Sequence, residues 1–451
     1  MPGNMTTMSE ASHARTFDSA DSSDLAGIGI GPFNLSLAAQ LDSVPELDVR
    51  FFERRSRFDW HPGMMLPDVE LQSSFLKDLV TSTNPTSPWS FVAYLVAHKR
   101  LFTFLNAQYE ALPRREFARY FEWVARELPN LTFGANVREI THDGHAFVVS
   151  TDNSRHRARN IALGVGATPF VPAWAASLRG DRCFHCSEAT ERLPKIASDR
   201  IAVIGGGQSG GEIVQHLLSR DVLPKELKWI SRRHNFEPIN DTPFSNQVFS
   251  PEYVDAFRQL SDDRKLAAFA THVLTSDGLS LSTINAIYRR LYTLRHIEGS
   301  GADIELLPNR DVIQVDRQQD GFRLIVRNGF DGGIEIVFAD ILVLATGYRF
   351  KLPDAIAPLR DRISVDRNER LILADDYSAA WDGPRQNRIF ALNAGRYSHG
   401  IADSQLSLMA WRSATIVNSL LGRNHFDLEL PQPVVRWGSG LAQTTDAMMS
   451  Q

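Results

Sequence analysis

Two glycine-rich turns, each set between an apolar strand pattern and a helical pattern, constrain the fold of this chain most strongly. The turns are residues 29–34 (GIGPFN) and 205–210 (GGGQSG). Further strand patterns close the two units at Glu53 and Ser231. Strand, turn, helix and strand form one βαβ unit, which is the building block of a parallel sheet. Two such units predict an α/β chain with two Rossmann-like dinucleotide-binding domains.

The first unit carries the residues expected of a nucleotide site. Gly29 permits the tight turn, and Gly31 lets the backbone approach a pyrophosphate at the helix N-terminus. Asn34 stands where a third glycine is usual, which predicts a wider or hydrogen-bonded crossing of helix and strand. Glu53 lies 24 residues after Gly29, where a carboxylate accepts hydrogen bonds from ribose hydroxyls. A glycine turn alone can be a plain tight turn, but this context predicts a nucleotide site.

The second unit matches the complete pattern, with Gly205, Gly207 and Gly210. Its second strand ends in Arg232 and Arg233 rather than in an acid. An arginine there accommodates a 2′-phosphate, so we expect NADPH rather than NADH, with a solvated strand end as the alternative. Two dinucleotide sites in one chain imply FAD in the first and NADPH in the second, with hydride passing from NADPH to the flavin.

Composition narrows the class of protein further. The 451 residues are 43% hydrophobic and 22% charged, which suits a globular chain of several domains. A formal net charge of -5 argues against nucleic acid as a partner, and 2 Cys exclude a disulfide scaffold. No apolar run approaches the roughly 18 residues of a membrane span, and the N-terminal stretch has no apolar core of a secretion signal. We therefore expect a cytoplasmic protein.

The patterns also suggest how the domains divide the chain. Residues 1–24 form a polar leader, which we expect to be disordered, and residues 438–451 form a tail. The expected FAD-binding domain comprises residues 25–198 and 343–437, the NADPH-binding domain comprises 199–245 and 299–342, and a helical substrate lobe comprises 246–298.

Cys183 and Cys186 form a CxxC motif, which a disulfide reductase would place beside its flavin. The motif is distant in sequence from both glycine turns, and no second pair completes a zinc site. We interpret it as two small buried thiols with His185 as a local hydrogen-bonding group, and we expect no metal. A pyridine nucleotide-disulfide reductase-like flavoprotein and a non-catalytic NADPH-binding protein are the alternatives.

Several motifs in one order resemble a known family. The chain resembles the microbial flavin-dependent N-hydroxylating monooxygenases of siderophore biosynthesis, the L-lysine N6- and L-ornithine N5-hydroxylases. The likeness runs from about Leu25 to Trp437 and is closer to the lysine- or diamine-type branch. The motifs that carry it are 60–64 (WHPGM), 72–79 (QSSFLKDL), 207–210 (GQSG), 345–348 (ATGY) and 398–403 (SHGIAD), with 75–80 (FLKDLV), 275–278 (TSDG) and 406–413 (LSLMAWRS) pointing to the branch.

The resemblance implies roles for individual residues. In the FAD site it implies Trp60, His61, Gln72, Ser404, Gln405 and Leu406, beside Gly29, Gly31, Asn34 and Glu53. In the NADPH site it implies Gln208, Ser209, Arg232, Ser276, Asp277 and Gly278, beside Gly205, Gly207 and Gly210. In the amine pocket it implies Lys77, Asn246 and Ser407. Lys77 would pair with a substrate carboxylate, and a structural salt bridge with a neighbour such as Asp78 is the alternative.

The same resemblance implies the reaction. Reduced flavin and O2 form a C4a-hydroperoxide, and a neutral primary amine attacks its distal oxygen, with no side chain acting as a covalent nucleophile. The pocket must therefore favour the deprotonated amine by limiting its hydration. L-lysine is the first expected substrate, putrescine or cadaverine the next and ornithine the third, in hydroxamate siderophore assembly. The oligomeric state stays open, with a homo-oligomer among the options.

Overall fold

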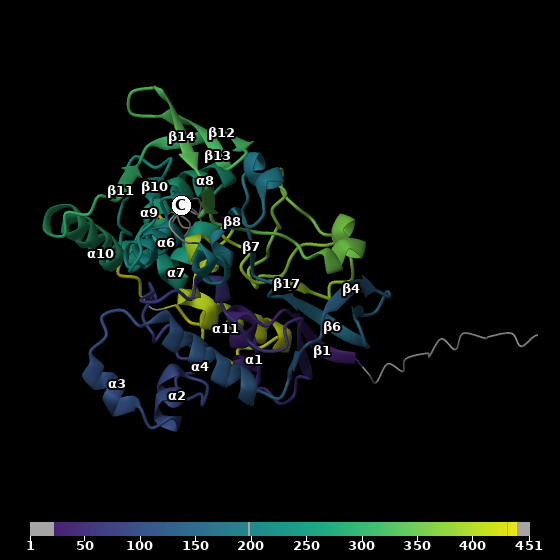
Figure 1. The fold of residues 1–451 in the computed structure, drawn as a ribbon. Helices are drawn as coiled ribbons and strands as arrows, with labels where there is room; N and C mark the ends of the chain where they lie inside the picture. The colour runs from purple at the N-terminus through teal and green to yellow at the C-terminus, as the bar shows by residue number, and fades with distance from the viewer. Residues whose placement is uncertain (1–21, 197–198, 431, 440–451) are drawn as a thin grey trace, which may run out of the picture.

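The computed structural model describes residues 22–196, 199–430 and 432–439, so most of the predicted leader and tail lies outside it. Residues 22–24, expected in the leader, already belong to the first strand. The chain forms two halves, one above the other in Figure 1, the first built on a mixed sheet and the second on a parallel sheet, with smaller sheets beside them. This confirms the predicted α/β class with two Rossmann-like units.

The first sheet has seven strands in the order β3-β2-β1-β6-β5-β4, and β17 also pairs with β6. Strand β1 runs parallel to both β2 and β6, as the first βαβ unit requires. Helix α1 (Pro32–Leu41) packs against α11 (Met409–Leu421) and α4 (Arg114–Glu127) in the largest hydrophobic core. The strands are β1 (Ser22–Ile28), β2 (Val49–Glu53), β3 (Leu131–Phe133), β4 (Val137–His142), β5 (Phe147–Thr151), β6 (Arg155–Leu163) and β17 (Ile389–Ala391).

The second sheet has five parallel strands in the order β11-β10-β9-β15-β8. Helix α6 (Gln208–Leu218) follows β9 through the second glycine turn, as predicted. Strand β8 was expected within the FAD-binding segment 25–198, yet it pairs with β15 at the edge of this sheet. A strand of three residues is too short for its sequence pattern to predict which sheet it joins. The strands are β8 (Cys183–His185), β9 (Arg200–Ile204), β10 (Glu226–Ile230), β11 (Asp303–Leu307) and β15 (Ile341–Leu344).

Two smaller sheets complete the strands. An antiparallel meander of β12 (Arg310–Gln318), β13 (Gly321–Asn328) and β14 (Ile334–Ala339) lies between β11 and β15 in the chain. It forms the top of the molecule in Figure 1. Strands β7 (Ala167–Pro169) and β16 (Tyr348–Phe350) pair where the chain crosses between the halves.

The segment between β10 and β11 is helical, as predicted for residues 246–298. Its last helix, α10, packs on α6 and buries Ile287 and Leu291 in the core of the second sheet. Part of the lobe therefore belongs structurally to that sheet. The helices are α7 (Pro251–Arg258), α8 (Asp262–Thr271), α9 (Val273–Asp277) and α10 (Leu281–Tyr292).

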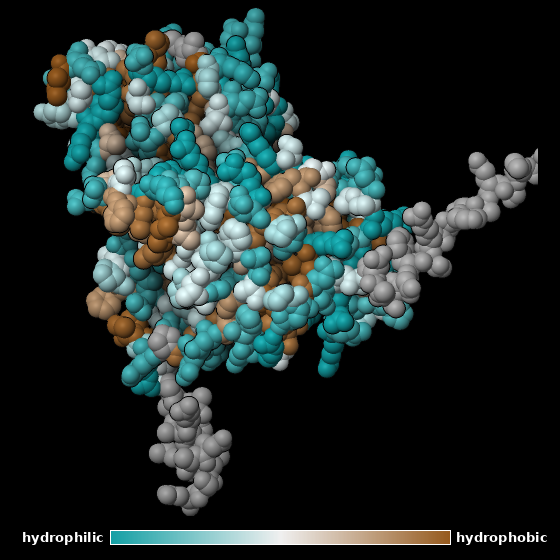
Figure 2. Space-filling view, turned by 90° about the horizontal axis from the view of Figure 1, so that it is seen from below, coloured by the Kyte–Doolittle hydropathy of each residue, from teal (hydrophilic) through white to brown (hydrophobic). Residues whose placement is uncertain are grey.

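Helices α2 (Phe91–Ala97) and α3 (Leu101–Ala107) form the lower edge of the molecule in Figure 1. Both expose large apolar side chains, among them Val96, Phe102 and Leu105. Figure 2, seen from below, shows such side chains as separate patches in a largely hydrophilic surface. Within the described ranges, every helix is too short or too polar to cross a bilayer.

A buried ion pair holds the C-terminal loop against the first glycine unit. Arg412, 2% exposed, pairs with the Asp403 carboxylate and donates to the Asp403 carbonyl at 2.8 Å. The other Asp403 oxygen accepts from the Gly395 N–H at 2.7 Å. The guanidinium also lies 4.2 Å from the ring centroid of Phe33, which follows the first glycine turn. The position of residues 395–406 therefore depends on one desolvated charge pair.

Arg412→Met should lower the free energy of unfolding by about 3–5 kcal/mol, because it leaves the Asp403 carboxylate buried without its cation. Urea unfolding of the cofactor-free protein measures the change. Arg423→Met is the matched control: Arg423 pairs with Glu46 on the surface, where both side chains are about half exposed, and should cost less than about 1 kcal/mol. Equal losses in the two variants would contradict a special role for the buried pair.

Candidate nucleotide and substrate sites

The first glycine turn lies at the carboxyl end of β1, between β2 and β6. Gly29 has a φ of +82°, and a Cβ there would lie 2.9 Å from the Gly164 carbonyl oxygen. Glu53 ends β2, and its carboxylate accepts from the N–H groups of Ile30 and Arg55, both at 2.9 Å. Gly31 caps α1 without a side-chain hydrogen bond, and the first helical residue, Pro32, has no N–H, so the N–H groups of Phe33 and Asn34 are the ones available to a phosphate. The turn fits a dinucleotide.

Asn34 replaces the close glycine contact with hydrogen bonds. Its Nδ2 donates to the carbonyls of Gly29 at 2.8 Å and Ile28 at 3.2 Å. The side chain occupies the space beside Gly164, where a Cβ would lie 2.4 Å from it. The hydrogen-bonded crossing expected from the sequence is therefore present. Its contact with FAD stays a prediction.

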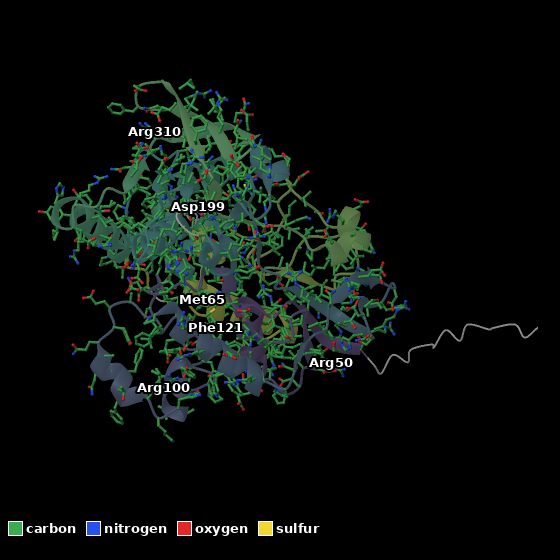
Figure 3. All side chains as sticks on the ribbon, in the orientation of Figure 1. Arg50, Met65, Arg100, Phe121, Asp199 and Arg310 are labelled. Carbon is green, nitrogen blue, oxygen red and sulfur yellow. The ribbon has the colours of Figure 1, made fainter. Side chains whose placement is uncertain are left out.

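The Trp60-His61 segment lies against the first half of the molecule and faces the second. Trp60 packs edge-to-face on Phe121, with ring centroids 5.2 Å apart, and Figure 3 places Phe121 just below the junction of the halves. His61 adopts the left-handed conformation, with a φ of +49°, and its ring lies 6.1 Å from that of Tyr348. The His61 side chain is exposed in the described structure.

The remaining residues expected at FAD differ in how far they are buried. Leu406 packs on the same hydrophobic core as Trp60, so the structure brings these two segments to one side of the first sheet. Ser404 and Gln405 are half-buried, and Gln72 is exposed.

The second glycine turn has closer backbone contacts than the first. A Cβ on Gly205 would lie 2.0 Å from the Ala345 carbonyl oxygen, and one on Gly210 would lie 2.1 Å from the Gly205 carbonyl oxygen. Gly207 caps α6 without a side-chain hydrogen bond, which leaves the N-terminus of this helix open to a phosphate. The turn therefore also fits a dinucleotide.

Gln208 has a structural role that the sequence did not indicate. Its Nε2 donates to Glu212 at 3.0 Å, and its Oε1 accepts from the Ser280 N–H at 2.7 Å. Ser280 precedes α10, so Gln208 ties the helical lobe to the second turn. Ser209, the next residue, lies beside the Cys186 thiol.

The two arginines at the end of β10 differ in their contacts. Arg233 donates to the Asp277 carbonyl at 2.7 Å. Arg232 is exposed, and in the described part of the chain it forms no hydrogen bond or ion pair. Arg232 is thus the cation that is free to meet a phosphate at this strand end.

The segment Ser276-Asp277-Gly278 lies against the second turn. A Cβ on Gly207 would lie 3.6 Å from the Asp277 carbonyl oxygen. The Asp277 carboxylate accepts from Arg396 at 2.8 Å, and the Ser276 hydroxyl accepts from the same guanidinium at 3.1 Å. Arg396 belongs to the C-terminal loop, so this contact joins the segment expected at NADPH to the loop expected at FAD.

Lys77 and Asn246 come together although 169 positions separate them. The Lys77 ammonium lies 5.8 Å from the ring centroid of Phe249, which shares a short helix with Asn246. Asp78 accepts from the N–H groups of Val80, Thr81 and Phe91 and forms no salt bridge with Lys77 in the described structure. Ser407 is buried, and its hydroxyl has no partner among the described residues.

One ion pair that connects the two halves was not predicted from the sequence. Arg114, at the start of α4, binds Glu212 of α6 through both guanidinium ends, at 2.5 and 3.1 Å. The side chains are 13% and 3% exposed. Arg114 also donates to the Glu70 carbonyl at 3.2 Å. The sequence offered one signal for this pair: Glu212 lies within the helix that follows the second glycine turn. A glutamate is rarely buried without a partner, so a cation could have been expected beside it.

The CxxC motif lies nearer the second glycine turn than its sequence position suggested. Strand β8 places Cys186 beside Ser209 and Tyr348. Both cysteines are buried and free, as predicted, and burial raises the pKa of Cys183 to about 11 and that of Cys186 to about 12. His185 hydrogen-bonds Ser187 and the Gly347 carbonyl. In the described ranges, no cluster of three His, Cys, Asp or Glu residues could hold a metal.

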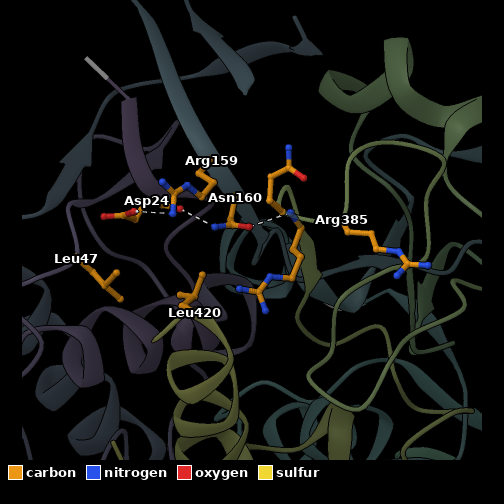
Figure 4. Close-up of a pocket in the computed structure, with 8 residues that line it drawn as sticks. Asp24, Leu47, Arg159, Asn160, Arg385 and Leu420 are labelled. Carbon is orange, nitrogen blue, oxygen red and sulfur yellow. Dashed lines mark hydrogen bonds and ion pairs between the residues drawn. The ribbon is translucent and has the colours of Figure 1, made fainter. Parts of the chain in front are cut away.

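A surface pocket lies elsewhere on the first half, at the amino end of β1 (Figure 4). Asn160 spans it, donating to the Asp24 carbonyl and accepting from the Arg388 N–H, both at 2.9 Å. Nucleotides bind at the carboxyl ends of parallel strands, so this pocket lies at the wrong edge for the predicted sites.

Known proteins share this arrangement. Residues 21–350 match the family described as L-lysine 6-monooxygenase/L-ornithine 5-monooxygenase. An L-lysine N6-monooxygenase of Escherichia coli is 39% identical, over 92% of this chain and 99% of its own. A cadaverine monooxygenase of Erwinia amylovora, solved with FAD, has a TM-score of 0.87 at 29% identity, over 93% of this chain and 99% of its own. An ornithine N-hydroxylase of Kutzneria, solved with reduced FAD, NADP+ and L-ornithine, has a TM-score of 0.82 at 32% identity, over 89% of this chain and 99% of its own.

Replacing both Cys183 and Cys186 by Ser should leave NADPH oxidation by the FAD-loaded protein within about twofold of its original rate. The raised pKa values keep both thiols protonated at neutral pH, and the thiolate is the reactive form. NADPH consumption measures the outcome. Loss of activity with retained flavin absorbance would instead support a dithiol reductase.

Proposed function

The chain belongs to the L-lysine 6-monooxygenase/L-ornithine 5-monooxygenase family, and we propose that within it the protein N-hydroxylates the terminal amine of L-lysine. It is a flavin-dependent N-hydroxylating monooxygenase of siderophore biosynthesis, with FAD and NADPH as cofactors. The preference for an amino acid over a diamine rests on one observation: Lys77 is a half-buried cation beside Phe249, without an ion-pair partner in the described structure. The choice of lysine over ornithine is supported by the 39% identity to an L-lysine N6-monooxygenase.

The residues at the first glycine turn fit FAD. Open N–H groups at the start of α1 would hold its pyrophosphate, and Glu53 would bind its ribose. The Trp60-His61 segment and residues 404–406 would enclose the rest of the cofactor. When bound, the flavin supplies the electrophilic oxygen that it takes from O2.

The residues at the second turn fit NADPH. The α6 N-terminus would hold the pyrophosphate, and Arg232 would bind the 2′-phosphate, which distinguishes NADPH from NADH. Ser276-Asp277-Gly278 lies against Gly207, close enough to contact the same cofactor.

The pocket must hold the reacting amine in its neutral form, because only a free lone pair is nucleophilic. Limited hydration disfavours an ammonium group, as the lowered pKa of Lys77 illustrates in the same region. Lys77 would pair with the α-carboxylate and so orient the distant terminal amine toward the flavin. Ser407 offers a buried hydroxyl that still lacks a partner among the described residues.

The test is hydroxylamine formation by FAD-loaded protein supplied with O2 and with NADPH or NADH. Lysine, ornithine, putrescine and cadaverine are added separately, and H2O2 is measured alongside. We expect product from L-lysine well above the others, and faster turnover with NADPH. NADPH consumption that yields only H2O2 with all four amines would contradict the proposed substrate class.

Lys77→Ala should raise the KM for L-lysine by about 10-fold to 100-fold, the loss of one hydrogen bond between charged groups. The KM for putrescine, which has no carboxylate, should change by less than about threefold. Steady-state hydroxylation assays measure both values. Lys351→Ala is the control, because Lys351 is an exposed lysine paired with Asp354. Equal effects of Lys77→Ala on the two substrates would remove the carboxylate-binding role.

A further inference from the structure

Asp241 is held beside the expected amine pocket by the turn that carries Asn246. The Asn246 N–H donates to the Thr242 carbonyl at 2.8 Å, which closes the turn. The Asn246 side-chain amide donates to Asp241 Oδ1 at 2.6 Å. From the sequence, Asn246 was the only candidate in this turn. In the structure, Asn246 orients the Asp241 carboxylate through Oδ1 and leaves Asp241 Oδ2 available.

The turn lies near Lys77. The 3-10 helix Ser245–Phe249 continues from it, and the Phe249 ring lies 5.8 Å from the Lys77 ammonium. Burial lowers the pKa of Lys77, and the negative charge of Asp241 raises it, so the two groups are within electrostatic reach. They form no direct ion pair in the described structure. Asp241 is exposed, which leaves its carboxylate accessible to a ligand.

We propose that Asp241 binds the α-ammonium group of an amino-acid substrate while Lys77 binds its α-carboxylate. This inference rests on the proposed function and deepens it. An anion and a cation on neighbouring elements match the zwitterionic head of an α-amino acid. A diamine offers only the ammonium group that suits Asp241, and an ω-amino acid without an α-amine offers only the carboxylate that suits Lys77. Asn246 is then a positioning residue for Asp241.

Three substrates distinguish the role of the Asp241 carboxylate from that of the Lys77 ammonium. L-lysine has both head groups, cadaverine lacks the carboxylate, and 6-aminohexanoate lacks the α-amine. Asp241→Asn should raise the KM for L-lysine and cadaverine by about tenfold or more, with 6-aminohexanoate changed by less than about threefold. Lys77→Ala should show the crossed pattern, with L-lysine and 6-aminohexanoate weakened and cadaverine little changed.

Asp241→Asn keeps the local structure, because the amide oxygen of the new side chain can still accept the hydrogen bond from Asn246. Asp241→Glu, which retains the charge, should recover part of the cadaverine affinity. Asp255→Asn is the matched control, since Asp255 is an exposed carboxylate on α7 that accepts from Gln259. Flavin absorbance and the melting temperature of each variant report whether it folds and loads FAD.

The outcomes keep the two proposals distinct. If the unmodified protein hydroxylates L-lysine but Asp241→Asn weakens all three substrates equally, or none, the role of Asp241 is overturned and the proposed function stands. If the unmodified protein hydroxylates none of the three, the proposed function fails. Calorimetric titration of L-lysine, cadaverine and 6-aminohexanoate into the FAD- and NADP+-loaded protein then tests Asp241 by binding alone, and the crossed pattern should persist. Its absence there would overturn the Asp241 assignment independently.

Discussion

Both halves of the molecule depend on backbone approaching backbone at the ends of parallel strands. In the first sheet, Gly29 packs against the Gly164 carbonyl at the end of β6. In the second, Gly205 packs against the Ala345 carbonyl at the end of β15. A side chain at either glycine would push the turn away from the neighbouring strand. The second glycine of each motif, Gly31 or Gly207, is the one that would leave room for a pyrophosphate at the helix N-terminus.

Two ion pairs connect the two halves of the molecule. The Arg114-Glu212 pair connects α4 of the first half with α6, which starts at the second glycine turn. The Arg396-Asp277 pair connects the C-terminal loop with the segment beside Gly207. The buried Arg412-Asp403 pair in turn fixes that loop against the first half. Three ion pairs therefore connect the first glycine turn with the second, and the Arg412-Asp403 pair is the most buried of the three.

The sequence predicted the local elements near the glycine turns well, because strand, turn and helix there are specified by residues close in the chain. The position of Glu53 at the end of β2 and the hydrogen-bonded crossing at Asn34 are examples. It was less informative for β8, where three residues join the second sheet instead of continuing the first domain. Gln208 shows a further difference, since its side chain secures the lobe through Ser280, a partner 72 residues away.

Sequence patterns were sufficient for the fold class, the family and both glycine turns, and they nominated Lys77 and Asn246 as candidate residues. These features depend on residues that lie close together in the chain and on motifs that follow one another in a fixed order. Both can be read directly from the sequence. The folded arrangement was needed to show that Lys77 has no salt bridge with Asp78, that Arg232 rather than Arg233 is free, and that Asp241 lies within electrostatic reach of Lys77. Which charges pair depends on distances across the fold, and the free energy of each pair depends on its burial. The spacing of residues in the sequence therefore predicts neither the pairs nor their free energies.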